Sequence, residues 1–369
     1  MTTPPTPGQA ASTSIHQISW IDKLDLIPGL LSILGTAIYA AVTAPFRGEA
    51  GAYTFKQHVT HAMVRKMVTR LDTHQLQYVG EPFSKVYEKW YRSQGGKPDI
   101  VTLNSGRKAF WMGDHKTAKY IVVYYHGGGF SLDGDDTHFR FWHSVQKDLQ
   151  DNNIPVAFLF LEYSLVPHAT YPTQIIEAIE AVNYVTTELK RPASEILLAG
   201  DSAGGNMCLA VLSQIMHPSP QLPQVKLAEG DKLKGLVLVA PWVSFRTDWP
   251  SVKRNEPKDI VCEYGGRKWS RDYLGGKETS PFAEALLAPA DWWKDSKVEQ
   301  LLVVAGADEI LIDPINQWVD KFKSVNPDTT TYVVGAHEGH IAPIFNLRFG
   351  DTTETEQGRA IKSWMKAKL

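Results

Sequence analysis

The stretch ILLAGDSAGG, residues 196–205, is the most informative part of this sequence about the fold. Its first four residues are apolar and predict a buried strand, and the residues after Gly205 predict a helix. Between them, Gly200 to Gly204 match the pattern G-x-S-x-G, in which a tight strand-to-helix turn exposes the serine hydroxyl. Ser202 is therefore the predicted nucleophile, and the alternative is a glycine-rich turn without chemistry.

Apolar runs rich in β-branched and aromatic residues predict further strands at residues 121–125, 156–161, 236–240, 301–305 and 332–334. Residues 175–189 have the apolar spacing of a helix. This alternation predicts an α/β fold, with a mostly parallel central sheet covered by helices on both faces.

Two stretches, 1–95 and about 245–290, fit this alternation poorly, and we expect them to form a cap over the strand ends. Residues 1–95 would be an N-terminal segment contributing part of the cap, with residues 1–14 disordered. Residues 96–369 would be the catalytic domain, with 245–290 as a cap insertion.

A second glycine motif, HGGGF at residues 126–130, follows the strand predicted at 121–125. Successive glycines allow backbone N–H groups to converge on a small space, as an oxyanion requires. A phosphate-binding loop is the alternative, but no Gly-Lys-Ser/Thr follows.

A catalytic serine needs a histidine base and a carboxylate that orients it. In a fold of this kind, the acid and then the histidine follow the serine along the chain. Asp308 and Glu309 follow the strand at 301–305, and His337 and His340 follow the last strand. The sequence His-Glu-Gly-His lacks the spacing of the zinc motif His-Glu-x-x-His, so no metal is expected.

The two glycine motifs together resemble those of the hormone-sensitive-lipase family of α/β hydrolases. Asp291-Trp-Trp293 and Gly339-His-Ile-Ala-Pro343 are similar to its fungal branch of steryl acetyl hydrolases, and the resemblance covers about residues 85–345. It implies a catalytic triad of Ser202 and His340 with one acid, and oxyanion donors at three positions, the N–H groups of Gly128, Gly129 and Ala203.

The acid departs from the family pattern, which has aspartate. In the family, the acid stands two residues before a leucine and four residues before an aspartate that begins the next helix. Leu311 and Asp313, taken as a helix N-cap, fit these offsets if the acid is Glu309. Counting forward from Ala305-Gly306 at the end of the preceding strand favours Asp308 instead. Of the two carboxylates, we expect Glu309 to orient the histidine.

The resemblance implies a serine hydrolase that cleaves short-acyl, acetyl-like esters of a bulky lipophilic alcohol, such as a sterol or a fungal secondary metabolite, through an acyl-enzyme on Ser202. No organic cofactor is required. The alternatives are an acyltransferase or lyase that uses the same triad, and a non-catalytic receptor of the same fold.

Composition limits the partners and the compartment. The net charge is −2 and no basic run occurs, so we expect no nucleic-acid partner. Two cysteines and the lack of an Asn-x-Ser/Thr site favour an intracellular protein. The sequence gives no indication of oligomeric state.

A segment near each end of the chain bears on its location in the cell. Residues 26–46 contain no charge, which predicts either membrane association or a buried helix that lines the substrate pocket. The C-terminal Ala367-Lys368-Leu369 resembles a peroxisomal signal, and the alternative is a solvated helix end. The expected location is the peroxisome or the cytoplasm, or the surface of the endoplasmic reticulum membrane.

Overall fold

The computed structural model describes residues 17–369, so the disorder expected for residues 1–14 lies outside the described residues. Its centre is an eight-stranded sheet with the order β1-β2-β4-β3-β5-β6-β7-β8. The strands are β1 Ile100–Thr102, β2 Lys108–Met112, β3 Tyr120–Tyr125, β4 Val156–Glu162, β5 Ile196–Asp201, β6 Gly235–Val239, β7 Leu301–Gly306 and β8 Thr330–Gly335. Neighbouring strands from β4 to β8 are parallel, whereas β1 and β2 are antiparallel additions at one edge.

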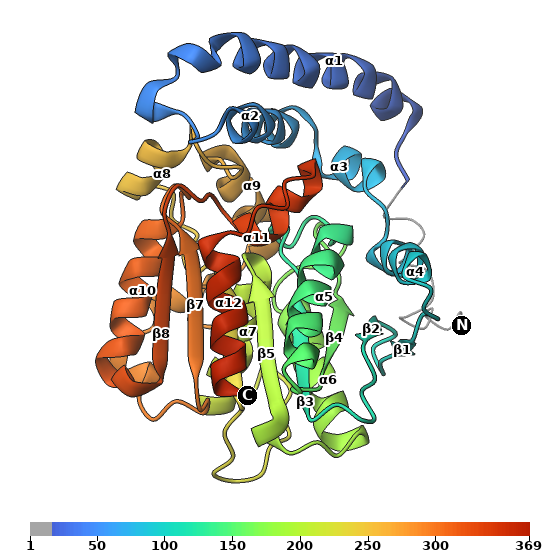
Figure 1. Ribbon diagram of the computed structural model, residues 1–369, viewed down its shortest axis with the longest axis vertical. Coiled ribbons are helices and arrows are strands. Elements are labelled where there is room, and N and C mark those ends of the chain that lie inside the picture. The colour runs from blue at the N-terminus through green and yellow to red at the C-terminus, as the bar shows by residue number, and fades with distance from the viewer. Residues whose placement is uncertain (1–16) are drawn as a thin grey trace, which may run out of the picture.

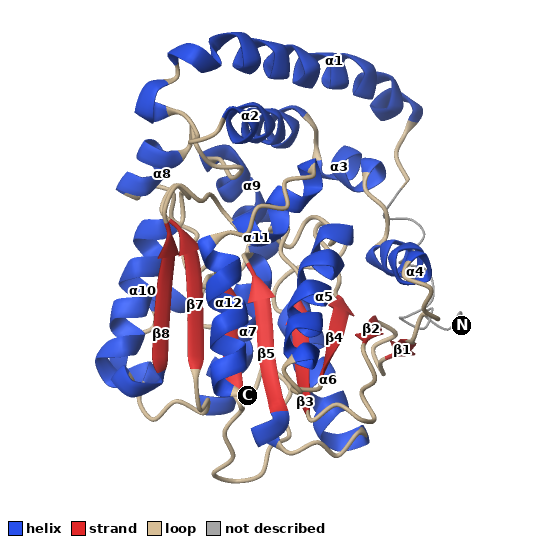
Figure 2. Ribbon diagram, viewed as in Figure 1, coloured by secondary structure: helices blue, strands red, loops and turns tan. Residues whose placement is uncertain are grey.

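Twelve α-helices surround the sheet in the part of the chain that the structure describes (Figures 1 and 2). They are α1 Trp20–Thr43, α2 Phe55–Arg70, α3 Thr73–Val79, α4 Phe83–Ser93, α5 Asp136–Asp151, α6 Thr173–Asn183, α7 Ala203–Met216, α8 Pro250–Asn255, α9 Glu263–Leu274, α10 Ile312–Val325, α11 Ala342–Phe345 and α12 Glu356–Lys368. The predicted α/β fold with a mostly parallel sheet is confirmed.

The core has two halves, one on each face of the sheet, because successive side chains of a strand point to opposite faces. On β3, Val123 belongs to the half of the core that includes side chains of α6, α7 and α10, and Val122 belongs to the half that includes side chains of α5 and α12. Strands buried on both faces read as continuous apolar runs, which is why the sequence predicted them.

Helices α1, α2, α3, α8 and α9 lie beyond the carboxyl ends of the parallel strands (Figure 1). They come from the two stretches, 1–95 and 245–290, that were expected to form a cap. Helix α2 lies between α1 and the rest of the molecule, so α1 forms the outermost layer.

Helix α1 is long and apolar enough to cross a membrane, and only 17% of its most apolar window is buried. We define the outer face of α1 by its exposed large apolar residues, which are Trp20, Ile21, Leu24, Ile27, Leu30, Leu31, Leu34, Ile38, Tyr39 and Val42. The alternative that residues 26–46 form a buried helix lining the pocket is wrong, because the outer face of α1 is exposed and the helix packs mainly on α2.

Candidate active site

Ser202 stands between β5 and α7 with φ +52° and ψ −115°, a backbone conformation that residues with a side chain rarely adopt. Its N–H donates to the carbonyl of Val239 at 2.9 Å, and the side chain is mostly buried. The turn therefore holds the hydroxyl at the carboxyl edge of the sheet, over the start of α7.

Two glycines of the motif are required by close packing at this turn. A Cβ on Gly204 would lie 1.9 Å from the carbonyl oxygen of Tyr125, and a Cβ on Gly200 would lie 2.4 Å from the backbone of Gly204. Strand β5, helix α7 and strand β3 approach each other too closely here for any side chain.

The loop at residues 126–130 follows β3 and also reaches this edge. Gly128 and Gly129 have φ of +104° and +60°, so glycine suits the left-handed backbone at both. Among residues 17–369, the N–H groups of Gly128, Gly129 and Ala203 donate no hydrogen bond to another group of the chain. Three backbone donors near the turn are thus available to a ligand.

Asp201, which precedes the serine, ties this loop to the turn. Its Oδ1 accepts a hydrogen bond from the N–H of Gly127 at 3.0 Å and another from the hydroxyl of Tyr124. The imidazole Nε2 of His138 lies 3.7 Å from the same oxygen. Burial opposes a charged imidazole, but Asp201 and Asp135 outweigh it and raise the pKa of His138 to about 10. A buried ion pair therefore fixes the glycine loop relative to Ser202.

His340 and Glu309 are brought together from two loops at the same edge, after β8 and β7. The Nδ1 of His340 lies 2.7 Å from Oε2 of Glu309, and both side chains are buried. The other oxygen of Glu309 accepts a hydrogen bond from the N–H of Gly306 at 2.8 Å. Asp308 points elsewhere and pairs with Lys258 at 3.1 Å. Of the two adjacent carboxylates, Glu309 is the one that contacts the histidine.

One step in the reasoning that selected Glu309 was wrong. Helix α10 begins at Ile312 with Leu311 as its cap residue, so Asp313 is not the N-cap but lies in the first turn. Asp313 instead accepts a hydrogen bond from the N–H of Ser251 at 2.7 Å and pairs with Arg254. Its position is set by contact with α8 rather than by capping.

The charge around His340 favours its protonated form. Burial acts to lower the pKa of this imidazole, but the hydrogen bond and charge of Glu309, with the charge of Asp259, outweigh burial and raise it. A neutral His340 accepts a proton more strongly as its pKa rises, which suits a general base.

Asp259 is a site residue that sequence reasoning missed. It lies between α8 and α9 and is fully buried, and its Oδ1 accepts hydrogen bonds from the N–H groups of Ile260 and His340 at 2.7 and 3.0 Å. Its Oδ2 accepts from the N–H of Ile310 at 2.7 Å. One carboxylate thus connects the loops that carry Glu309 and His340. No local pattern marks it, because the surrounding sequence is polar and irregular.

The cap holds the same loops through other contacts. Asn255 donates from Nδ2 to the carbonyls of Ala307 and Glu309 at 3.1 and 2.8 Å. From α2, Arg65 donates to the carbonyl of Asp259, and the Nδ1 of His61 lies 2.6 Å from the carbonyl of Lys258. Asn255 therefore contacts the acid loop directly, whereas α2 contacts Lys258 and Asp259 of the other cap stretch.

A small cavity of about 30 Å³ lies beside Ser202. Its lining is mainly apolar and includes Gly129, Trp242, Trp269, Val261 and Leu311. The indole of Trp269 covers Gly129 so closely that a Cβ there would lie 2.4 Å from the ring. Such a volume holds about one water molecule, and a short acyl chain fits it better than a long one.

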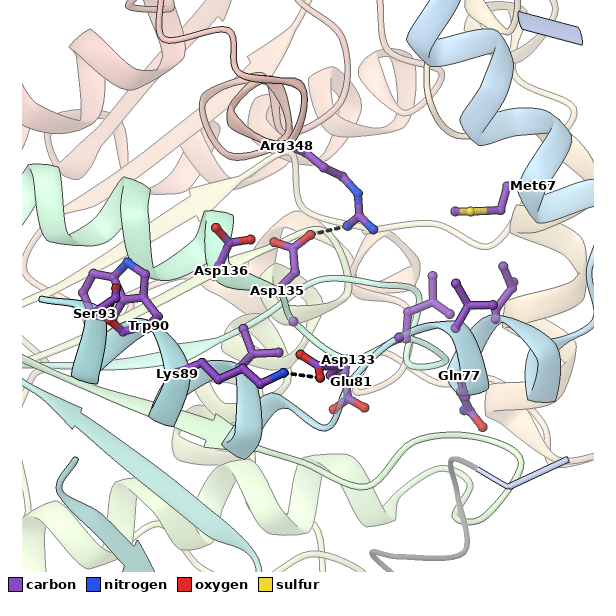
Figure 3. A pocket seen from close by; sticks show the side chains of 16 residues that line it. Met67, Gln77, Glu81, Lys89, Trp90, Ser93, Asp133, Asp135, Asp136 and Arg348 are labelled. Atoms are coloured by element: carbon purple, nitrogen blue, oxygen red, sulfur yellow. Dashed lines mark hydrogen bonds and ion pairs between the residues drawn. The ribbon is translucent and has the colours of Figure 1, made fainter. Parts of the chain in front are cut away.

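A larger cavity of about 540 Å³ lies away from Ser202, between α3, α4 and the loop before α5 (Figure 3). Lys89 pairs with Glu81 across one part of it, and Arg348 pairs with Asp135 across another. Asp133 and Asp136 add further acidic groups to its wall. Ser202, Glu309 and His340 are not among the residues that line this cavity, so we assign it no part in the site.

Within residues 17–369, no group of three or more His, Cys, Asp or Glu side chains is arranged to hold a metal ion. The two cysteines, Cys208 and Cys262, are buried and unpaired.

Residues 122–342, more than half of the chain, match the family of proteins with the α/β hydrolase fold. A putative steryl acetyl hydrolase of Schizosaccharomyces pombe is 26% identical over 54% of this chain and 53% of its own length. An acetyl-hydrolase of Streptomyces hygroscopicus is 25% identical over 68% of this chain and 78% of its own length. The chain thus spans about half the length of the first of these curated relatives.

A crystal structure of a hormone-sensitive lipase from a metagenome library superposes with a TM-score of 0.59 at 19% identity, covering 74% of this chain and 86% of that chain. The predicted fold and the resemblance to the hormone-sensitive-lipase family, with steryl acetyl hydrolases among the relatives, are confirmed. The relatives are named as hydrolases and esterases, which is the enzyme class that the sequence predicts.

Proposed function

Because this chain belongs to the α/β hydrolase fold family, we propose that it is a serine hydrolase of carboxylic esters, with Ser202, His340 and Glu309 as its catalytic triad. The observation that carries the proposal is the 2.7 Å contact between His340 and Glu309, at the sheet edge where Ser202 stands. A serine with a histidine that is oriented by a carboxylate is the arrangement that activates a hydroxyl for acyl transfer.

In the proposed mechanism, His340 takes the proton of Ser202 as the serine oxygen attacks the ester carbonyl. The negative charge that develops on the carbonyl oxygen is received by the N–H groups of Gly128, Gly129 and Ala203. His340 then gives its proton to the leaving alcohol, which leaves an acyl group on Ser202. Water, deprotonated by His340, attacks this ester and releases the acid, and His340 returns the proton to Ser202.

The preferred substrate in this proposal is an acetyl-like ester of a bulky lipophilic alcohol, such as a sterol or a fungal secondary metabolite. Two observations support it. The cavity beside Ser202 is small and apolar, and two relatives carry acetyl hydrolysis in their names. In the proposed orientation the acyl group occupies this cavity, against Trp242 and Trp269.

Replacement of Ser202 by alanine tests the proposal. The Ser202→Ala variant should lose turnover of acetyl esters by roughly 10⁶-fold if the triad acts as a unit, and should no longer react with a fluorophosphonate. A variant that keeps a few per cent of the activity would contradict the assignment. Product analysis with an added alcohol separates the alternatives, because an acyltransferase would form a new ester. A receptor would give no product and no labelling of the wild type.

A further inference from the structure

We propose that the outer face of α1 binds the surface of a lipid bilayer, with the helix lying in the plane of the interface. The proposal starts from an inverted distribution of side chains. Every exposed position of α1 is a large apolar residue, Pro28 or Gly35. A helix on the surface of a protein in water normally turns its polar side outward.

The charged residues of α1 face the protein instead. Asp25 forms a two-pronged ion pair with Arg70 of α2, with N–O distances of 2.6 and 2.8 Å. Gln75 donates to the same carboxylate at 3.0 Å, and to the carbonyl of Asp22 at 3.1 Å. Lys23 lies over the rings of Trp20 and Tyr78. Asp25 therefore attaches the helix to α2 and α3, whereas the carboxylate of Asp22 accepts hydrogen bonds from Ser19 at the start of the helix.

The exposed apolar area is large for a protein in water. With ten such side chains, all of them more than half exposed, the outer face presents on the order of 1,000 Å² of apolar surface, against roughly 300–600 Å² for the largest patch of a typical soluble protein. Phe46, Tyr53 and Phe55, which follow the helix in the sequence, are exposed as well. Trp20 and Tyr39 are residue types that favour the membrane–water boundary.

The contacts of the inner face indicate that α1 lies on a bilayer and does not cross it. Leu26 and Ile33 pack against Leu71 and Leu76. Gly29 lies so close to Leu71 that a Cβ on the glycine would be 2.8 Å from that side chain. A spanning helix would break these contacts and leave Arg70 without Asp25. In Figure 1, α1 runs along the outside of the cap and across the direction of the strands, as docking along its length requires.

A bilayer fits this face better than a second copy of the chain does. Protein–protein interfaces carry about one hydrogen bond per 100–200 Å², so an area of this size would present about five to ten polar groups. On the outer face of α1, the only side chains with a polar atom are those of Trp20 and Tyr39. A lipid surface requires no hydrogen-bonding side chains, and it accepts an uncharged helix face of this kind.

Vesicle binding of the purified full-length protein tests the docking. We expect co-sedimentation with phosphatidylcholine vesicles, and a partition constant at least roughly tenfold lower in the double variant Leu34→Asn with Ile38→Asn, whose side chains are 55% and 57% exposed. The matched control is Leu287→Asn with Val334→Asn, which alters two exposed apolar residues outside the patch and should leave the partition constant unchanged.

Three results would overturn the proposal: wild-type protein that stays in the supernatant, equal loss of binding in the control variant, or light scattering that shows a dimer dissociated by the α1 substitutions without vesicle binding. The last result would assign the face to a second copy.

Spin labels test the orientation of the helix. Cys208 and Cys262 are buried, so labels attach selectively at introduced cysteines, here in the single variants Leu24→Cys, Leu31→Cys and Ile38→Cys. A helix in the plane of the interface gives all three labels a similar, shallow depth in the bilayer. A depth that changes steadily from residue 24 to residue 38 would mean that α1 crosses the bilayer, and would exclude docking in the plane.

Discussion

The carboxylate of Asp259, a residue of the cap, accepts a hydrogen bond from the backbone N–H of His340 at 3.0 Å. It also accepts one from Ile310, which follows Glu309, at 2.7 Å. The loops of the proposed acid and base are thus held by a group that belongs to neither. The cap contributes to the geometry of the site as well as covering it.

Asp259→Asn should lower kcat/KM and shift its pH dependence. An amide offers one acceptor oxygen in place of two, and the lost hydrogen bond to a charged group corresponds to a fall of about 10- to 100-fold. His340 must be neutral to accept a proton, so activity rises with pH through its pKa. Asp259 helps to raise that pKa, so its removal moves the acid limb of the profile to lower pH.

The measurement is kcat/KM of an acetyl ester from pH 5 to pH 9. The control is Asp248→Asn, the same chemical change at an exposed cap residue that pairs with Arg246. An unchanged acid limb in Asp259→Asn would show that this carboxylate does not act on His340.

Glu309→Gln should reduce kcat by on the order of 10⁴-fold, because an amide no longer holds the imidazole in the required tautomer. Asp308→Asn is the matched control on the adjacent residue, and it should lose much less, since Asp308 pairs with Lys258 and not with His340. Steady-state kinetics of both variants decide the matter. The reverse order of effects would assign the acid to Asp308.

Trp269→Ala should broaden the range of acyl chains that are hydrolysed. The wild type should hydrolyse esters with acyl groups from acetyl up to hexanoyl faster than esters with acyl chains of twelve or more carbons, because the indole limits the cavity beside Ser202. Removal of the indole should raise the ratio of kcat/KM for decanoyl over acetyl esters roughly tenfold. Trp292→Ala, which removes a half-buried indole that packs against the ring of His217, is the control. A ratio that is equal in both variants would count against an acyl pocket at Trp269.

The predicted peroxisomal location can be tested with a fluorescent protein fused ahead of residue 1. We expect the fusion in peroxisomes, and outside them when Leu369 is deleted. Helix α12 extends to Lys368, and the hydroxyl of Tyr120 donates to the carbonyl of Leu369 at 2.9 Å. A receptor would have to detach this end, so Tyr120→Phe should increase import. A wild-type fusion that follows a secretory marker would exclude the peroxisome.

The sequence was sufficient where a local pattern determines structure. The apolar run at 121–125 lies in a strand buried on both faces, and the glycines around Ser202 are required by backbone contacts. The sequence was insufficient where the structure of a segment depends on a partner far away along the chain. Strands β1 and β2 are short, without a long apolar run, and they depend on pairing: β1 pairs with β2, and β2 pairs with β4.

The same reason applies to the site and the cap. Asp259 has no local signal, since its partners lie 51 and 81 residues away. For residues 26–46, membrane association and a buried helix that lines the pocket both require the same uncharged sequence. The choice between them depends on Arg70, which lies 45 residues from Asp25 and turns the polar side of α1 inward.

The backbone at Ser202 has a consequence for how this chain can evolve. At φ +52° and ψ −115°, a glycine adopts without strain the backbone conformation in which the serine is strained. This single replacement would raise the free energy of unfolding by on the order of 1 kcal/mol. The mutation that removes the proposed nucleophile therefore also stabilises the fold. A duplicated copy of this chain, released from selection for activity, would be expected to exchange its serine early and to keep its architecture long afterwards.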